Sequence, residues 1–451
     1  MNSEIDIKKL KGYPVIKIIG HKNADFDSIT SGCLLEYIFN RLGIKSEFVL
    51  QDGIIDTFFK EIANKIGFDC DFPSKLEKND ILFLVDHTAK YKQQVVGCID
   101  HHPTIVDIKD NYIVNKNKTS CAKLIYEWGE QLGIEIPEKL TILTIYSCYM
   151  DSCSFKSTKV QDSDRIWCES MIEKFKMNKK DVEHFGYGIT DTSLPYEDYI
   201  KTGLKEYPFK NKKLYSSYIV TDKDFDLYKT QKVLQKELND NIIAWCFIVN
   251  NVKYNYNKIL VITKEYYLIH KTANKLHSRG NEIIPALMQF LSFENDGRLT
   301  KLLIDTNTQI STMESCTSGL VASNITDYDG SSAILKGSDI TYSNEAKIMS
   351  GVSKIIINEY GVYSKEVSFH MARCIAKKFN SNIGVGVTGT IGNTDPANKD
   401  STEGEVFYTI YPGTPIELRY NNIKNSKKEL KQKTTDIILA TIYSIITRGR
   451  E

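Results

Sequence analysis

Short apolar runs in the first third of the chain are followed within two residues by acidic or histidine side chains. Two of these runs are Val15–Ile19 and Ile81–Val85, and a third ends at Ile99. The polar residues after them are His21, Asp86 and the triplet Asp100-His101-His102. Amphipathic segments lie between the runs, an alternation typical of βαβ units with a parallel sheet. Because ligands of such sheets gather beyond the carboxyl ends of the strands, the pattern predicts an α/β fold with its site at that edge.

Further acids extend this set. The first run continues into His21-x-x-x-Asp25-x-Asp27, and a later apolar stretch, residues 140–149, leads to Asp151. Carboxylates and imidazoles gathered together are suited to binding a divalent metal and handling a phosphate. Taken singly, the residues also have plainer interpretations. Asp25 and Asp27 precede a helix, where acids act as caps, and two adjacent histidines can form a solvated turn.

In type and order, the motifs resemble the DHH phosphoesterase superfamily, in particular the family II (manganese-dependent) inorganic pyrophosphatases. Four motifs in the family's order are a specific signal. The resemblance implies two Mn²⁺ ions, with Mg²⁺ or Co²⁺ as substitutes, and a water between them acidified into a nucleophile. The implied ligands are His21 and Asp25 for one ion, Asp27, His101 and Asp151 for the other, and Asp86 as the bridge. His102 is the implied catalytic group beside the phosphate, with His87 supporting the site.

The segment after residue 200 resembles the smaller α/β domain that closes over the metal site in this family. Its motif is Ser278-Arg279-Gly280-Asn281, where the family has Ser-Arg-Lys-Lys. Arg279 and Lys205 are the implied phosphate-binding residues, and a guanidinium suits bidentate binding of phosphate. The family's next two lysines are absent, which weakens the expectation of fast pyrophosphate hydrolysis. Residues 188–210, polar with scattered Gly and Pro, are expected to be an interdomain linker.

From residue 297 onward the motifs change. Glu314-Ser315-Cys316-Thr317 follows a strand-like run and leads into a helix, and Tyr342-Ser343-Asn344-Glu345-Ala346-Lys347 comes later. These motifs resemble the CinA C-terminal domain, the nicotinamide mononucleotide amidohydrolase family, which implies a third α/β domain without a cofactor. The implied catalytic residues are Ser315, Ser332, Tyr342, Lys347 and Thr388, with Gly389 binding substrate.

Amide hydrolysis without a metal needs an activated nucleophile and an oxyanion site. Ser315 at a helix start would have backbone N–H groups beside it, and Lys347 with a lowered pKa could act as the base. Which serine attacks is open, and Ser315 could instead be a helix N-cap. Ser318 replaces a glycine of the family, and residues 392–398 replace its glycine-rich loop. These departures leave the substrate less certain than the fold.

The length and composition of the chain limit the number of domains and the classes of partner. A chain of 451 residues favours several domains, predicted here at 1–190, 200–294 and 297–451. With 58 Lys and Arg against 57 Asp and Glu, bulk charge argues for neither nucleic-acid nor membrane-surface binding. No apolar stretch approaches the roughly 20 residues that span a bilayer, and residues 1–6 lack a secretory apolar region. Scattered cysteines in apolar surroundings indicate buried free thiols, so we expect a cytoplasmic protein, as a homo-oligomer.

The combined expectation is a bifunctional hydrolase. One site would hydrolyse inorganic pyrophosphate or short polyphosphate, and the other would deamidate nicotinamide mononucleotide to nicotinic acid mononucleotide. One alternative is a DHH phosphodiesterase that acts on short oligonucleotides or cyclic dinucleotides. Another is a nucleotide-sensing protein that binds its ligands with little turnover.

Overall fold

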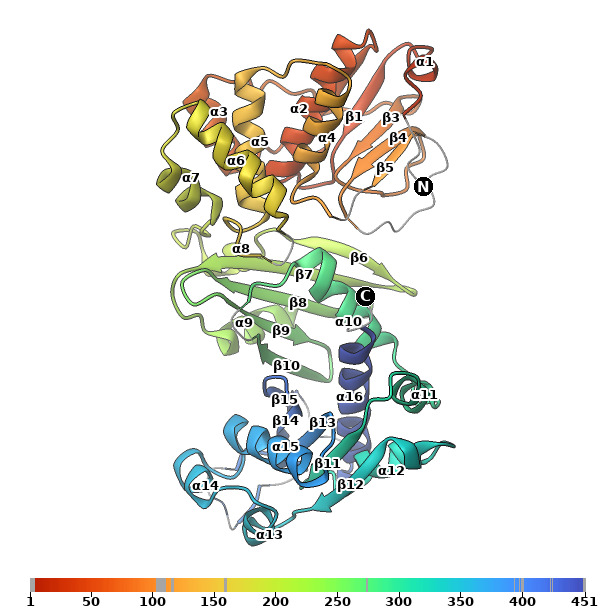
Figure 1. The fold of residues 1–451 in the computed structure, drawn as a ribbon, viewed down its shortest axis with the longest axis vertical. Coiled ribbons are helices and arrows are strands. Elements are labelled where there is room, and N and C mark those ends of the chain that lie inside the picture. The colour runs from red at the N-terminus through yellow and green to blue at the C-terminus, as the bar shows by residue number, and fades with distance from the viewer. Residues whose placement is uncertain are drawn as a thin grey trace.

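The computed structural model describes residues 5–448 except 103–110, 115–116, 158–159, 273–274, 393, 397, 399–400, 422 and 424. Pro103 and two positions of the 392–398 loop therefore lie outside the described residues. The elements form two units along the long axis of the molecule (Figure 1). Within the described part of the chain, no helix is both long and apolar enough to cross a membrane.

The N-terminal unit, residues 5–186, contains a sheet of five parallel strands in the order β2-β1-β3-β4-β5. The strands are β1 (Ile16–Ile19), β2 (Ser46–Val49), β3 (Ile81–Val85), β4 (Gln94–Asp100) and β5 (Tyr112–Val114). This order reverses direction between β1 and β3, which is the point where open α/β sheets bind their ligands. The carboxyl ends of β1, β3 and β4 therefore meet at one edge, as the sequence predicts.

Both faces of this sheet are covered. Phe83 points into the main core, and its neighbour Leu84 packs into a smaller cluster on the opposite face. Strand β3 is therefore apolar throughout, as buried parallel strands are. The apolar stretch before Asp151 forms a helix, not a strand. The helices of this unit are α1 (Ile7–Leu10), α2 (Phe26–Arg41), α3 (Thr57–Ile66), α4 (Cys121–Gln131), α5 (Glu138–Asp151), α6 (Asp162–Lys174) and α7 (Lys179–Gly186).

The C-terminal unit is built on one ten-stranded sheet in the order β12-β11-β13-β14-β15-β10-β9-β8-β7-β6. Strands β10 and β15 join its halves in antiparallel register, with Tyr266 opposite Tyr420 and Leu268 opposite Leu418. The second and third predicted domains therefore share a single sheet. The strands are β6 (Lys205–Phe209), β7 (Lys212–Thr221), β8 (Ile242–Asn251), β9 (Tyr256–Ile262), β10 (Tyr266–Lys271), β11 (Ile310–Glu314), β12 (Leu335–Ile340), β13 (Ile383–Thr390), β14 (Glu405–Tyr411) and β15 (Ile416–Tyr420).

Helices of this unit flank the sheet. They are α9 (Leu227–Leu234), η1 (Gln235–Glu237), the π-helix η2 (Arg279–Ile283), α10 (Ile284–Ser292), α11 (Arg298–Asp305), α12 (Leu320–Thr326), η3 (Ser331–Ala333), α13 (Asn344–Met349), α14 (Lys354–Tyr360), α15 (Lys365–Phe379) and α16 (Lys427–Arg448). Helix α16 runs along the junction between the two halves of the sheet (Figure 1). There Ser444 donates to the carbonyl of Ala286 in α10 at 2.9 Å. Helix α15 packs directly on β13 because Gly384 has no side chain. A Cβ at this position would come within 2.0 Å of the Ala372 carbonyl oxygen.

The two units touch near the predicted linker. Residues 188–210 contain a short helix, α8 (Tyr196–Tyr199), and the whole of β6, so the segment is partly structured. Lys156 of the N-terminal unit donates to the carbonyl of Val252 at 2.8 Å, and Ser157 forms an isolated bridge with Leu276. All ten cysteines are free, and those at positions 33, 98, 121, 148, 168, 246 and 316 are buried.

Candidate functional site

Asp86 lies at the centre of the N-terminal site. It follows β3 directly and has a left-handed backbone with φ of 61°, which is uncommon for a residue other than glycine. Its Oδ1 atom lies 3.3 Å from His101 Nε2, and its Oδ2 atom lies 3.5 Å from His21 Nε2. The side chain is 2% exposed. A strained, buried carboxylate between two imidazoles is the arrangement expected of a bridging ligand.

Both histidines present the same nitrogen to this carboxylate. His21 Nδ1 lies 2.8 Å from the Lys22 carbonyl oxygen, and His101 Nδ1 lies 3.2 Å from that of Lys118. A carbonyl can only accept, so each Nδ1–H donates to it, and each ring directs its Nε2 atom toward Asp86. Metal-binding histidines in proteins are typically held in this way.

Three further acids complete the group. Asp25 Oδ1 caps α2 by accepting from the Ser28 N–H, while its Oδ2 lies 3.4 Å from His21 Nε2. The helix-cap interpretation and the ligand interpretation therefore both describe Asp25. Asp27 Oδ2 and Asp151 Oδ2 lie 3.6 and 3.5 Å from His101 Nε2.

Asp27 is anchored from behind by the N-terminus of α4. It accepts the N–H groups of Cys121 at 2.8 Å and Ala122 at 3.0 Å, and the hydroxyl of Ser147 at 2.6 Å. The partial positive charge of a helix N-terminus favours an ionised carboxylate there. Asp27 is thus fixed in orientation by groups far away in the sequence.

The residues fit a divalent metal. Within two of the groups that they form, His21-Asp25-Asp86 and Asp27-His101-Asp151, the donor atoms lie within 4.8 Å of one another. His21 Nε2 and Asp86 Oδ1 are buried and have no hydrogen-bond partner among the described residues. Buried polar atoms are normally satisfied, so a bound cation would account for both. Mixed carboxylate and imidazole donors suit manganese and its neighbours.

Electrostatics point the same way. Burial raises the pKa of Asp86 well above its usual range, and the Asp25 carboxylate adds to the rise. Burial likewise raises the pKa of Asp27 to about 7, with Asp86 contributing. Burial opposes ionisation of Asp25 too, but His21 and Lys205 outweigh it and lower its pKa well below the usual value. Buried acids packed together need a compensating positive charge, which a divalent cation supplies.

His102 stands at the border of this site. Its Nδ1 lies 2.9 Å from Asp100 Oδ1 and 3.4 Å from Asp86 Oδ1, and its side chain is 27% exposed. Asp100 thus orients the ring, and part of the side chain is exposed. His87 is different, because its two nitrogens contact the Val85 carbonyl and the Tyr91 hydroxyl, both at 2.9 Å.

The C-terminal unit brings groups to the same place. Lys205 Nζ lies 3.7 Å from Asp25 Oδ2. A Cβ at Gly280 would lie 3.4 Å from His102 Cδ2, so η2 borders the site. Arg279 donates to the Gly203 carbonyl at 2.5 Å and stacks over the Tyr218 ring at 4.8 Å. The structure therefore places Lys205 beside the candidate metal centre. The Arg279 guanidinium contacts a carbonyl and an aromatic ring of the C-terminal unit.

A second site lies beyond β11, far from the first along the molecule (Figure 1). Lys347 Nζ lies 3.1 Å from Ser315 Oγ and donates to the Thr341 carbonyl at 2.9 Å. Lys347 is 1% exposed, and burial lowers its pKa from 10.5 to about 8. A buried amine that deprotonates readily, in contact with a serine hydroxyl, has the chemistry that a nucleophile–base pair requires.

The helix-cap interpretation of Ser315 is wrong. Helix α12 begins five residues later with Gly319 as its N-cap, and the Glu314 carboxylate accepts from the N–H groups of Val321 and Ala322 at 3.1 and 2.9 Å. These two N–H groups are therefore occupied and do not serve as an oxyanion site. Ser315 instead extends the sheet, because its own N–H donates to the Val387 carbonyl at 3.0 Å.

Two buried hydroxyls next to this pair lack a protein partner among the described residues. They belong to Thr317, in the turn after Ser315, and to Thr341, whose carbonyl accepts from Lys347. Both side chains are buried. Since buried hydroxyls are normally paired, they offer hydrogen bonds to a polar ligand at the Ser315–Lys347 pair.

The structure does not gather every predicted residue here. Ser332 lies in η3, before β12, whereas Thr341 follows the far end of that strand, so Ser332 is at the opposite edge of the sheet. Tyr342 is 62% exposed. Thr388 is buried in β13 and donates to the Val362 carbonyl at 2.9 Å. Gly389 is required by packing, since a Cβ there would lie 2.5 Å from the Glu405 carbonyl oxygen.

Two family models match the chain. The model of the DHH family, N-terminal domain, matches residues 15–147, and that of the CinA C-terminal domain matches residues 294–446. One part of the chain, here termed the DHH domain, is thus similar to the first family, and another, here termed the CinA domain, is similar to the second.

Relatives match the CinA domain most clearly. A CinA-like protein of Fervidobacterium nodosum is 36% identical over 150 residues, which are 33% of this chain and 36% of that protein. A CinA-like protein of Flavobacterium psychrophilum is 35% identical over 165 residues, 35% and 39% of the two chains. The chain thus spans about a third of the length of the curated relatives that it matches.

Solved structures resemble each part. A Methanococcus jannaschii protein assigned to the family II inorganic pyrophosphatases matches 55% of this chain and 87% of its own, with 21% identity and a TM-score of 0.47. A competence/damage inducible protein from Agrobacterium tumefaciens matches 33% of this chain and 93% of its own, with 26% identity and a TM-score of 0.29.

The altered loop of the CinA domain contributes an acid that the sequence analysis did not single out. Asp395 Oδ2 accepts from the Tyr363 hydroxyl at 2.7 Å and from the Asn398 amide at 2.6 Å. Asn344, on the helix that carries Lys347, donates to Asn398 Oδ1 at 3.2 Å. The loop is therefore tied to α13. Its departure from the family's glycine-rich sequence was the available signal.

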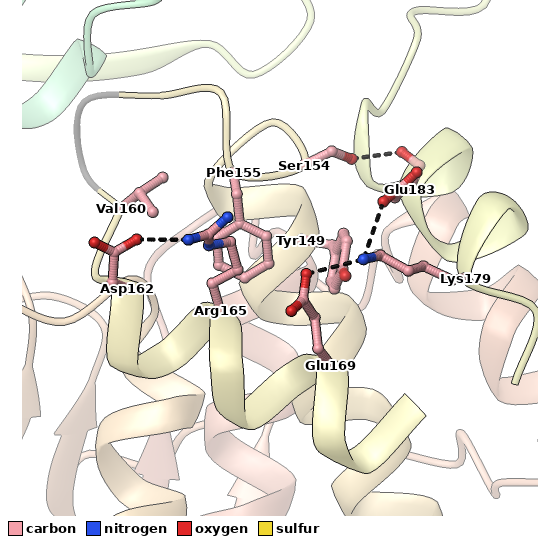
Figure 2. A pocket seen from close by; sticks show the side chains of 9 residues that line it. All are labelled: Tyr149, Ser154, Phe155, Val160, Asp162, Arg165, Glu169, Lys179 and Glu183. Atoms are coloured by element: carbon pink, nitrogen blue, oxygen red, sulfur yellow. Dashed lines mark hydrogen bonds and ion pairs between the residues drawn. The ribbon is translucent and has the colours of Figure 1, made fainter. Parts of the chain in front are cut away.

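The DHH domain also has a separate hollow of about 430 Å³ beside α6 and α7 (Figure 2). Its charged side chains pair with one another, Lys179 with Glu169 at 2.9 Å and Arg165 with Asp162 at 3.0 Å. Asp86 and the other five predicted ligands are absent from its lining, which consists of Tyr149, Ser154, Phe155, Val160, Asp162, Arg165, Glu169, Lys179 and Glu183. The hollow is therefore distinct from the candidate metal centre.

Proposed function

We propose that the chain is a bifunctional hydrolase whose DHH domain cleaves phosphoanhydrides in a manganese-dependent reaction. Inorganic pyrophosphate and short polyphosphates are the proposed substrates. The observation that carries this proposal is the convergence of His21, His101 and three carboxylates, those of Asp25, Asp27 and Asp151, around Asp86. A pair of divalent cations held there would acidify a water and neutralise phosphate charge.

The chain's own residues supply the remaining functions. His102, oriented by Asp100, faces outward where the phosphate would lie. Lys205 brings an ammonium group to the border of the site, which favours an anionic substrate. The Asp86 N–H donates to the Ile99 carbonyl at 3.0 Å. This hydrogen bond ties β3 to β4 and fixes the backbone of Asp86.

For the CinA domain we propose deamidation of nicotinamide mononucleotide to nicotinic acid mononucleotide, without a metal. The Ser315–Lys347 contact of 3.1 Å supports it. Ser315 Oγ would attack the carboxamide carbon while the neutral Lys347 amine takes the hydroxyl proton. Lys347 would then return this proton to the leaving nitrogen, which departs as ammonia. Water hydrolyses the acyl-serine, giving the carboxylate and restoring Ser315.

A second candidate for the DHH domain is hydrolysis of a phosphodiester, such as a short oligonucleotide or cyclic dinucleotide. Gly280 stands where the resembling family has a lysine, and its position beside His102 carries no charge. Fewer cations suit a less charged substrate. We further propose small phosphorylated substrates as the partners of both sites, and a cytoplasmic homo-oligomer as the working form.

The test is a substrate screen of the full-length protein with Mn²⁺, Mg²⁺ or chelator. The substrates are pyrophosphate, tripolyphosphate, a cyclic dinucleotide, a short oligonucleotide and nicotinamide mononucleotide. We expect phosphate release from pyrophosphate with Mn²⁺, and ammonia release under all three conditions. Release of nucleotide monophosphates alone would replace the first proposal with the second candidate. Binding without turnover of any substrate would contradict both hydrolase proposals.

A further inference from the structure

Asp164 is a fully buried acid that belongs to neither predicted site. It lies on α6, and its side chain is 0% exposed. Its Oδ2 atom accepts the N–H of Thr119 at 3.0 Å, and its Oδ1 atom pairs with Lys118 Nζ at 3.3 Å. A buried carboxylate is costly unless it is paired and hydrogen-bonded, and Asp164 is both.

Asp164 contacts Lys118 and Thr119, and the backbone of Lys118 also contacts His101. The Lys118 carbonyl oxygen accepts from His101 Nδ1 at 3.2 Å. Two other contacts restrain the same loop. Lys118 Nζ also pairs with Glu127 at 2.7 Å, and the Thr119 hydroxyl accepts from the Gln161 N–H at 3.2 Å. Lys118 and Thr119 are thus held by Asp164, Glu127 and Gln161, and Asp164 contacts both of them.

The Lys118 carbonyl fixes the orientation of the His101 ring. With this oxygen in place, Nδ1–H donates to it and Nε2 points toward Asp27, Asp86 and Asp151. If the carbonyl moved away, the ring could rotate. Nε2 would then no longer face the position of a cation.

We propose that Asp164 is a positioning residue of the metal centre, which sets the orientation of His101 through the Lys118–Thr119 backbone. This inference rests on the proposed metal-dependent function. Asp164 does not contact the cation; it determines how well the His101 side of the centre binds one. Removal of such outer partners typically weakens metal affinity by roughly 10–100-fold.

The experiment is titration of Mn²⁺ into chelator-stripped full-length protein by calorimetry, for wild type, Asp164→Asn and Asp162→Asn. Asp162 is a matched control because it lies on the same helix, pairs with Arg165 at 3.0 Å and is 82% exposed. We expect two binding steps in the wild type, with one of them weakened roughly 10–100-fold in Asp164→Asn. Asp162→Asn should stay within about twofold of the wild type, because an exposed pair contributes little.

A second readout separates positioning from general stability. In ¹⁵N spectra of the metal-free protein, the His101 Nδ1–H should show a hydrogen bond to a carbonyl in the wild type, and this signal should weaken in Asp164→Asn. If Asp164→Asn does not fold, Asp164→Glu is compared with Asp162→Glu, and only the former should weaken Mn²⁺ binding.

Two results would overturn the inference alone: a wild type that binds two ions with Asp164→Asn unchanged, or a control that loses as much affinity. A wild type that binds no divalent metal would instead overturn the proposed metal-dependent function, and this inference with it.

Discussion

Lys347 Nζ lies 3.1 Å from Ser315 Oγ, although the two residues are 32 positions apart in the chain. Sheet pairing creates this contact, because Ser315 directly follows β11 and the parallel edge strand β12 leads to α13, which carries Lys347. The Thr341 carbonyl fixes the amine from the other side. The pair is therefore built on rigid elements, which favours a defined geometry for proton transfer.

Replacement of Lys347 by alanine should lower kcat/KM for ammonia release by roughly 10²–10⁴-fold, the usual contribution of a general base. The reason is that the serine loses the amine that takes its proton. Lys354→Ala is the control, because Lys354 is an exposed lysine at the start of the next helix, α14. A variant of Lys347 that releases ammonia at the wild-type rate would exclude this residue as the base.

The pH profile of ammonia release should follow the titration of Lys347. Burial lowers the pKa of this amine to about 8, and only its neutral form can accept a proton. The value of kcat/KM should therefore rise from pH 7 to pH 9, with its midpoint near 8, and then level off. In an initial-rate assay of ammonia release, a profile that falls over this range would contradict the assignment.

The pKa of Lys347 also predicts how stability depends on pH. The folded-state value of about 8 lies below the ordinary 10.5, so the unfolded chain binds more protons between these values. Lys347 should therefore make the free energy of unfolding rise with pH from about 8 to 10.5. Denaturant unfolding of wild type and Lys347→Met should show this slope only in the wild type.

Asp86→Ala should remove phosphate release and reduce bound Mn²⁺ by at least one ion per chain. Asp86 contacts both histidines of the centre, so both ions would lose a ligand. Ammonia release should persist, because the CinA site is remote and has no metal ligands in common with it. Metal content by mass spectrometry checks the first point, with the exposed Asp71→Ala as the control. Unchanged metal stoichiometry would exclude Asp86 as a ligand. Chelation of the wild type should reproduce the same split between the two activities.

Gly280→Lys should speed pyrophosphate hydrolysis about tenfold, corresponding to about 1.4 kcal/mol of added transition-state binding. The position borders His102, and a Cβ there makes an ordinary contact at 3.4 Å, so the side chain can be accommodated. Gly280→Ala separates the effect of charge from that of bulk and should leave kcat/KM nearly unchanged. If the lysine slows a phosphodiester substrate and does nothing for pyrophosphate, the second candidate function is favoured.

Ser318→Gly should leave the free energy of unfolding within about 1 kcal/mol and raise ammonia release. Ser318 has a left-handed backbone with φ of 52°, which costs a non-glycine residue about 1–3 kcal/mol. Its hydroxyl regains part of this by donating to the Ser315 carbonyl at 3.2 Å. Ser323→Gly, within α12, is the contrast and should destabilise by about 1 kcal/mol. Thermal unfolding and ammonia assays check both variants.

The sequence alone predicted the parallel sheet and the residues at its edge. Runs such as Ile81–Val85 are apolar because both faces of β3 are covered, and that requirement is visible in neighbouring residues. His21, Asp86 and His101 could be found because strand ends in a parallel sheet meet at one edge. The Ser315 and Lys347 motifs were likewise visible. The domain limits and the roles of the site residues stay predictions.

Tertiary structure decided what no local pattern contains. The pairing of β10 with β15 joins Tyr266 to Tyr420 and merges two expected sheets into one, a long-range contact without a local signal. Glu314, not Ser315, satisfies the start of α12, because the carboxylate reaches it only once the turn has folded. The sequence gives Asp164 no distinction from other helix residues, and only packing places it against the loop that contacts His101. Sequence patterns record which faces are buried and where chains turn, whereas hydrogen-bond partners between distant segments are fixed only when the segments pack.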